Sequence, residues 1–509
     1  MFPTLLLFII LAYFGLLLGI AFYTSRYSDN ESFFIGNRNS TWWVVAFGMI
    51  GTSLSGMTFI SVPGTVGKGG FEYFQVVIGY ILGYFVVAFI LLPLYYRLKV
   101  ISIYSYLQQR FGNIAYKTGA FFFILSRTLG ATLRLYLVIK VMEFFVLDQF
   151  GISFEVASVI ILLLILLYTY RGGVKTIVWT DTLQTTFMLL GLIVCIIYIM
   201  NSMHTSLAGT WDMLSLKHMT HTWNMDVKAP GYFLKQIVGG MFITIGMTGL
   251  DQEMMQKNIS VTNLAGSQKN MITMSLLMGV VVFIFLLLGG LLYLFANTQG
   301  GAFINTSTGN SFILNGKSIV GDDIFPFVVF HYLPPVAGIV FIIGLISALF
   351  PSADGALTAL TSSFCIDILG IRQKKGMTDK QQKRTRLFVH YTFAAIFLMC
   401  IFIFKAIDNG SLIQLLLNIA GYTYGPLLAL FSFGIFTKRN LRGESVPLIC
   451  IAGPCLCFVI KQNDKAWLDG YSIGLELLLI NALITWILLL LISKKPNHTN
   501  VHPSTTNYS

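Results

Sequence analysis

Charged residues are scarce in this chain of 509 residues: Asp, Glu, Lys and Arg together make up 11%, whereas 56% of the residues are hydrophobic. Soluble domains contain about 25% charged residues, so the composition excludes a water-soluble enzyme, a DNA-binding module and a disordered chain. A membrane-crossing helix needs about 20 mainly apolar residues, and a chain of this length can hold many. The sequence therefore indicates a polytopic protein of the lipid bilayer that binds no nucleic acid.

Sequence motifs for chemistry are missing as well. The chain has no GxxxxGK[ST] phosphate-binding loop, which argues against ATP-driven transport. It has no HExxH motif and no GxSxG motif on an apolar helix, so we expect no enzyme and no catalytic residues. The six cysteines all lie inside apolar runs, where packing thiols are the expected role.

Apolar runs predict an all-helical protein with thirteen transmembrane helices. They lie at roughly 4–23, 43–64, 71–96, 118–146, 153–170, 176–200, 236–256, 271–296, 335–370, 387–407, 411–436, 445–460 and 472–493. The connections on one side, with Lys257 and the basic cluster at 372–386 among them, hold 22 of the 33 Lys and Arg residues. By the positive-inside rule that side is cytoplasmic. We therefore expect a protein of the plasma membrane with its N-terminus outside and its C-terminus in the cytoplasm.

Two of these spans contain residues that interrupt helices. The second span is rich in glycine and hydroxyl residues, which favours either a broken helix or close packing between helices. In the ninth span, Pro351 removes the helical partner of the Ser347 carbonyl, so we expect a second break there. Carbonyls freed in this way are typical cation ligands of secondary transporters.

A few charges fall within the spans. Asp181 and Asp354 are carboxylates in apolar surroundings, where each should face a partner, a cation or a water-filled cavity. Sodium and protons could both use these two acids. Arg127 and Arg134 lie seven residues apart on nearly one helix face. Arg127 could bind a carboxylate of a substrate, or it could pair with Asp181 or another acid.

Four sequence blocks then identify a resemblance. They are GTSLSGMTFISVPG (51–64), YSYLQQRFG (104–112), YTYRGGVKTIVWTDTLQ (168–184) and SADGALTALTSSFCIDIL (352–369). In content, order and spacing they resemble the sodium/solute symporter family, which includes glucose, proline, pantothenate, iodide and sialic acid transporters. The resemblance runs to about residue 493. It implies the leucine-transporter fold, with two inverted repeats of five helices after one extra N-terminal helix.

The resemblance also implies a division of the chain. We expect an N-terminal helix and loop (1–40), a first repeat (41–201), an outer loop (202–235), a second repeat (236–436), two C-terminal helices (437–495) and a cytoplasmic tail (496–509).

The resemblance further implies a sodium site shared by the family. Its ligands would be the carbonyls of Gly51, Leu54 and Ala348 and the hydroxyl of Ser352. Where the family usually has a further serine this chain has Pro351, so one ligand would have to come from a carbonyl or water.

A second sodium site, found in some members of the family, would use Asp181. The serines that complete it elsewhere are replaced here by Asp354 and Gly355. The added negative charge either strengthens cation binding or converts the site to proton coupling.

The implied substrate pocket lies beside the same broken helix. Its candidate contacts are Ser55, Thr58, Gln75 and Arg127, with Tyr422 and Tyr424 as possible gates. The glutamine that contacts sialic acid in some members is shifted here to Gln75, with Val77 in its place, so we do not predict a sialic acid transporter. An arginine favours an anionic solute, while the hydroxyl groups suit a sugar equally well.

We therefore expect a sodium-coupled symporter that imports a small polar organic solute by alternating access, with Na+ as the coupling ion. Two alternatives stay open. One is a proton-coupled symporter that uses Asp181 and Asp354, and the other is a transporter-like channel or sensor.

Overall fold

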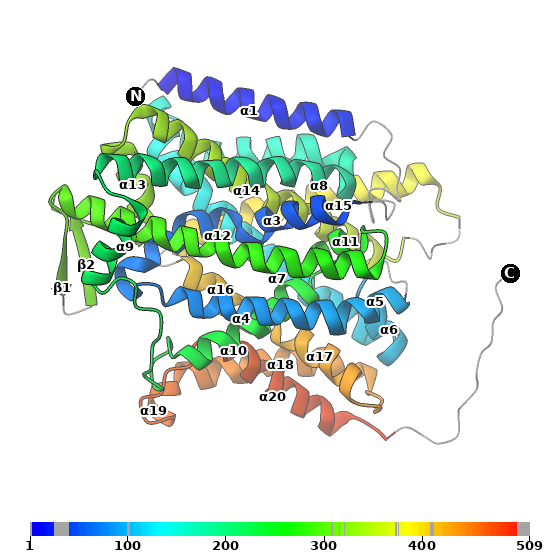
Figure 1. Ribbon diagram of the computed structural model, residues 1–509. Helices are drawn as coiled ribbons and strands as arrows, with labels where there is room; N and C mark the ends of the chain where they lie inside the picture. The colour runs from blue at the N-terminus through cyan, green and yellow to red at the C-terminus, as the bar shows by residue number, and fades with distance from the viewer. Residues whose placement is uncertain are drawn as a thin grey trace.

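Long apolar helices make up most of the computed structural model. In Figure 1 they run roughly parallel in stacked layers, from α1 at one side of the molecule to α20 at the other. The structure describes residues 3–24, 40–98, 102–306, 309–314, 316–319, 321–371, 374, 376–407 and 412–495. The predicted loop at 25–39, part of the basic cluster (372, 373 and 375) and the predicted tail at 496–509 lie outside the described residues.

The helices of the first half are α1 (Pro3–Thr24), α3 (Trp42–Gly69), α4 (Tyr73–Val86), α5 (Leu92–Leu98), α6 (Ser105–Phe111), α7 (Asn113–Met142), α8 (Phe154–Ser202), α9 (Leu207–Leu216), α10 (Phe233–Thr244) and α11 (Gln252–Ile259). The second half contains α12 (Leu264–Thr298), α13 (Ile324–Tyr332), α14 (Pro335–Ser363), α15 (Asp379–Ile407), α16 (Leu412–Thr423), α17 (Gly425–Phe436), α18 (Val446–Gln462), α19 (Asp464–Trp467) and α20 (Leu477–Ile492). Short π-helical turns at Val87–Leu91 and Ile245–Gly249 continue α4 and α10.

Helices that can cross a membrane contain most of the helical residues. Within the described residues, eight helices are long and apolar enough to cross a bilayer, and ten are if each of two bent pairs counts as one span. Three shorter apolar helices, Leu7–Ile20, Phe154–Leu167 and Leu477–Ile492, also coincide with predicted spans. The prediction of an all-helical polytopic membrane protein is confirmed, while the number thirteen stays a prediction.

α8 joins two predicted spans in one helix of 49 residues. At 1.5 Å per residue it would extend about 74 Å if straight, far more than the ~30 Å of a hydrocarbon core. Its apolar stretches, Phe154–Leu167 and Ile177–Ser202, therefore serve as separate segments.

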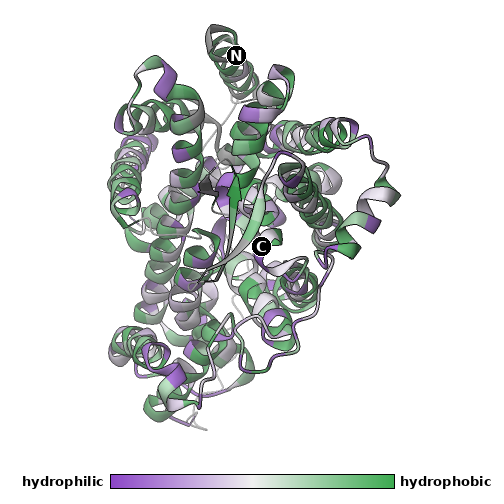
Figure 2. Cartoon of the chain, turned by 90° about the vertical axis from the view of Figure 1, so that its left-hand side faces the viewer, coloured by the Kyte–Doolittle hydropathy of each residue, from purple (hydrophilic) through white to green (hydrophobic). Residues whose placement is uncertain are grey.

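The connection between the predicted spans at 271–296 and 335–370 contains more regular structure than the sequence suggested. Residues expected to form a polar loop at 297–334 contain an antiparallel sheet of three strands, β1 (Ala302–Thr306), β2 (Gly309–Leu314) and β3 (Lys317–Ile319), followed by α13. In the register of β1 and β2, Phe303 pairs with Phe312. The sheet lies at one end of the bundle and faces the viewer in Figure 2, whose colouring shows how strongly apolar residues dominate the helices. This small sheet is an addition to the predicted helical fold.

The two predicted helix interruptions have different outcomes. α3 is broken at Ser55, whose φ of 50° and ψ of 166° lie outside the helical region, so the structure shows the first of the two interpretations left open for this span. α14 runs through Pro351 as one helix, so the break predicted there is wrong. Proline is tolerated in such helices when neighbouring helices support the interrupted turn, and α14 packs against α3, α7 and α8.

Two further bends were not predicted. The helical segments Phe233–Gly249 and Gln252–Ile259 meet at 67°, and Leu412–Thr423 and Gly425–Phe436 meet at 42°. At the first bend Asp251 caps α11, because its Oδ1 accepts hydrogen bonds from the backbone N–H groups of Glu253 and Met254. A buried acid that caps a helix inside a membrane bundle is a candidate functional residue.

Glycines allow α4 and α10 to approach closely. A Cβ added at Gly79 would overlap the carbonyl of Ile237, and one added at Gly240 would overlap the carbonyl of Val76. Small residues are the usual contact surface between membrane helices, since lipid provides no hydrophobic force that holds helices together.

We predict that Gly79→Val destabilises the fold by about 1–3 kcal/mol, as overpacking does in other cores. The measurement is thermal unfolding of the purified protein in detergent. Gly15→Val is the matched control, because Gly15 lies on α1 with no atom within 4 Å of an added Cβ. Equal melting temperatures for the two variants would contradict the close α4–α10 contact.

Candidate functional site

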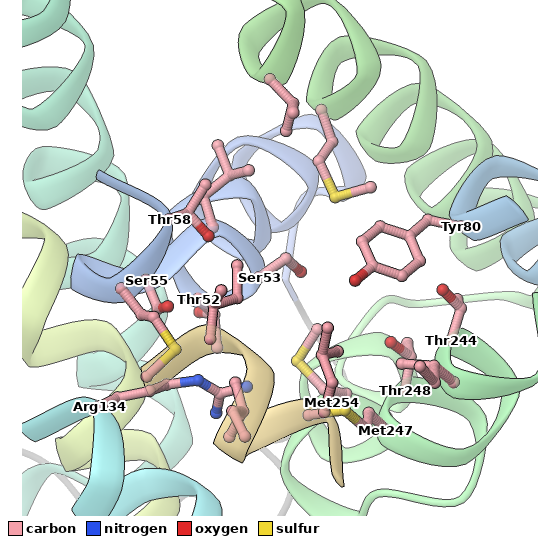
Figure 3. Close-up of a pocket in the computed structure, with 18 of the residues that line it drawn as sticks. Thr52, Ser53, Ser55, Thr58, Tyr80, Arg134, Thr244, Met247, Thr248 and Met254 are labelled. Carbon is pink, nitrogen blue, oxygen red and sulfur yellow. The ribbon is translucent and has the colours of Figure 1, made fainter. Parts of the chain in front are cut away.

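A pocket lies beside the break of α3. Hydroxyl groups contribute much of its lining, and Figure 3 shows Ser53 of α3 facing Tyr80 of α4 and the threonines of the α10 segment. The lining residues with hydroxyl groups are Thr52, Ser53, Ser55, Thr58, Tyr73, Tyr80, Tyr84, Thr244 and Thr248. Four methionines and several aliphatic side chains complete the wall. We call this space the central pocket, and its lining suits a small solute with both polar and apolar surface.

Two arginines of α7 line the central pocket, and one of them is bound to acids. The Arg127 guanidinium forms an ion pair with Glu253 and lies 3.9 Å from Oδ2 of Asp251. Tyr424 donates a hydrogen bond of 3.1 Å to the same Asp251 oxygen. Of the two roles that the sequence left open for Arg127, the structure shows pairing with acids of the protein.

Lys257 and Asp181 extend the group of charged side chains around Arg127 and Glu253, and we call these four residues the charged cluster. Lys257 Nζ donates hydrogen bonds to Asp181 Oδ2 at 2.7 Å, to Thr52 Oγ1 at 2.8 Å and to Glu253 Oε1 at 3.2 Å. The Thr52 hydroxyl in turn donates to Asp181 Oδ2 at 3.0 Å. The cluster thus joins the broken helix α3 to α8 and α11.

The placement of Lys257 corrects the sequence analysis, which counted it among the cytoplasmic loop residues. Only 2% of the residue is exposed, because an ammonium group with two carboxylate partners can be buried where a lone one cannot. The signal was present in the sequence: Asp251, Glu253 and Lys257 are three ionisable residues at the end of an apolar run. Such residues within a membrane segment are functional candidates by default.

Arg134 is the pocket residue that the sequence analysis passed over. It is 7% exposed, and its Nε has no hydrogen-bond partner among the described residues. None of the ion pairs found in the described part of the chain includes it. In Figure 3 its side chain reaches toward the central pocket from the side opposite Tyr80. The guanidinium is therefore available to an anionic ligand.

The other predicted substrate contacts lie in two places. Ser55 and Thr58 line the central pocket together with Arg127. Gln75 is buried in a separate pocket near the N-terminal end of α4, where its Nε2 donates to the backbone carbonyl of Glu72 at 3.0 Å. Burial raises the pKa of the Glu72 carboxyl, against the opposing effect of His221 beside it. The role of each residue in substrate binding stays a prediction.

The predicted sodium ligands belong to α3 and α14, two helices that pack against each other. Gly51 and Leu54 immediately precede the break at Ser55, and Ala348 and Ser352 are buried one turn apart on α14. A broken helix releases carbonyl groups from the helical hydrogen-bond pattern. Within the described residues no group of three or more His, Cys, Asp or Glu side chains could hold a metal ion. Carbonyl and hydroxyl oxygens of this kind are the ligands expected for Na+.

We predict that Arg127→Met destabilises the protein by about 3–5 kcal/mol, because Glu253 would lose its guanidinium partner in a buried site. Arg134→Met, two turns further along α7, should change stability far less since no ion pair is lost. Thermal unfolding of both variants in detergent is the measurement. An Arg134 variant that unfolds at a lower temperature than the Arg127 variant would reverse this assignment.

Comparison with known proteins places these features in context. The sequence pattern of the sodium:solute symporter family matches residues 33–444. A sodium/sialic acid symporter of Proteus mirabilis is 23% identical over 448 residues, covering 86% of this chain and 85% of the relative. Sodium/glucose cotransporter 1 of Oryctolagus cuniculus is 22% identical over 473 residues, covering 85% of this chain and 68% of the relative.

Solved structures show the same fold. A Na+-coupled sialic acid symporter in a substrate-bound, outward-open state superposes with a TM-score of 0.80 at 19% identity, covering 96% of this chain and 97% of the other. A nucleobase-cation symporter in a closed conformation gives a TM-score of 0.52 at 12% identity, covering 91% and 95%.

Proposed function

Because the chain belongs to the sodium:solute symporter family, we propose that it imports a small carboxylate-bearing solute together with Na+. In the proposed orientation the N-terminus lies outside a plasma membrane and the C-terminus inside, as the distribution of Lys and Arg indicates. Alternating exposure of the central pocket to the two sides would move the solute. Each ligand would raise the affinity of the protein for the other, since coupling between binding sites is reciprocal.

The observation that carries the proposed substrate class is Arg134. A buried guanidinium without an ion pair is costly, and a carboxylate of the solute would neutralise it through paired hydrogen bonds. The hydroxyl groups of Ser53, Thr244 and Thr248 would serve the polar remainder of the solute. An acidic sugar combines both features. The relative of Proteus mirabilis is named for sialic acid, a solute of this chemical class.

The proposed sodium site consists of the carbonyls of Gly51, Leu54 and Ala348 and the hydroxyl of Ser352. Two of these residues adjoin the break in α3, which also forms one wall of the central pocket. A bound cation there would hold α3 against α14 and so shape the pocket for the solute. None of the compared proteins favours the alternative of proton coupling through Asp181 and Asp354.

We predict that Arg134→Met lowers the affinity for a carboxylate-bearing solute about 10- to 100-fold, which corresponds to the ~1.5–3 kcal/mol of a hydrogen bond to a charged group. Uptake by proteoliposomes should be measured with sialic acids, hexuronic acids and neutral hexoses. Arg134→Lys should retain only part of the affinity. Lysine keeps the positive charge but lacks the planar guanidinium that donates paired hydrogen bonds. If neutral hexoses were transported best and equally well by the variant, the proposed substrate class would be wrong.

We also predict that Ser352→Ala raises the sodium concentration for half-maximal uptake, since one oxygen ligand is removed. Ser432→Ala is the control, because the hydroxyl of Ser432 bonds to the carbonyl of Ala429 within α17. Uptake should be driven by a sodium gradient alone and compared with a proton gradient alone. Full uptake without sodium would overturn sodium coupling, and currents without solute accumulation would indicate a channel.

A further inference from the structure

We propose that Lys257 is a built-in cation at Asp181, so that this protein binds a single Na+ in each transport cycle. The inference rests on the proposed function as a sodium-coupled symporter. It assigns a role to Lys257, which belongs neither to the proposed sodium site nor to the lining of the central pocket.

The hydrogen bonds of Lys257 are complete. A lysine ammonium has three donors, and the three acceptors within reach are Asp181 Oδ2, Thr52 Oγ1 and Glu253 Oε1. They come from α8, α3 and α11. A carboxylate and a hydroxyl oxygen from different helices are also what a bound Na+ would require. The ammonium therefore occupies a position suited to a metal cation.

Glu253 adapts this site to an ammonium group. A Cβ added at Gly355 would overlap Glu253 Oε1, so the absence of a side chain at Gly355 leaves the space that the carboxylate fills. Arg127 holds the other oxygen of the same carboxylate. The glycine at 355 and the acid at 253 thus belong to one arrangement that directs Oε1 toward Lys257.

The positive charge of Lys257 disfavours binding of a Na+ beside it at Asp181. Within the bundle, two positive charges a few ångströms apart repel each other far more strongly than in water. A Na+ enters and leaves in each cycle, whereas the ammonium is covalently attached and keeps α3, α8 and α11 joined throughout.

The test is direct binding of 22Na+ to the purified full chain, with no solute added. We expect the wild-type protein to bind one Na+ with a Hill coefficient of one. Lys257→Met should raise the binding to two Na+ with a Hill coefficient above one, because Asp181 loses its resident cation. Asp181→Asn and the double variant Asp181→Asn/Lys257→Met should each bind one.

Controls separate folding from binding. Lys269→Met removes an exposed lysine of α12 and should bind sodium as the wild type does. The double variant removes both charges of the ion pair, so neither is left buried alone. Its sodium binding can therefore be measured even if Lys257→Met by itself fails to fold. All variants should elute as a single species in size-exclusion chromatography before binding is measured.

The outcomes distinguish this inference from the proposed function. Asp181 Oδ1 has no partner among the described residues, so a second Na+ at that oxygen is the competing result. Two Na+ on the wild type and one on Asp181→Asn would overturn the role of Lys257 while leaving sodium coupling intact. Absence of 22Na+ binding to every protein would instead refute sodium coupling itself.

Discussion

Charge buried in hydrocarbon must be neutralised within the protein, and the cluster of Asp181, Lys257, Glu253 and Arg127 is where this chain meets that constraint. The four residues come from α7, α8 and α11 and are each at most 4% exposed. Removing Lys257 or Arg127 would leave a buried carboxylate without its counter-charge, which is strongly destabilising. The cluster therefore fixes how the broken helices meet α7 and α8.

The two arginines of α7 differ in their surroundings, and we assign Arg127 to the charged cluster and Arg134 to solute binding. Arg127 is occupied by Glu253, whereas Arg134, seven residues on, lines the pocket without an ion pair in the described part of the chain. Their similar position on the helix makes them look alike in the sequence. The difference arises because α11 begins at a sharp bend and brings its acids within ion-pair distance of Arg127.

Parts of the fold and site followed from local patterns. Long apolar runs predict helices wherever they occur, and the glycine and hydroxyl residues around Ser55 correctly indicated the break in α3. The break predicted at Pro351 is absent because several neighbouring helices pack against α14 and support it. Asp251, Glu253 and Lys257 were overlooked because an apolar run that ends in charges resembles the end of a span beside a loop.

Local sequence patterns predict the all-helical membrane fold and allow the break beside the pocket, since each depends on residues close together in the chain, and the order and spacing of the four blocks add the resemblance to the family. Only the packed structure shows which charges pair. Lys257 and Asp181 are 76 positions apart, and Arg127 and Glu253 are 126 apart. Composition and spacing cannot specify such partners, because an ion pair between distant helices exists only once packing has brought the two side chains together. That packing leaves Arg134 for a ligand.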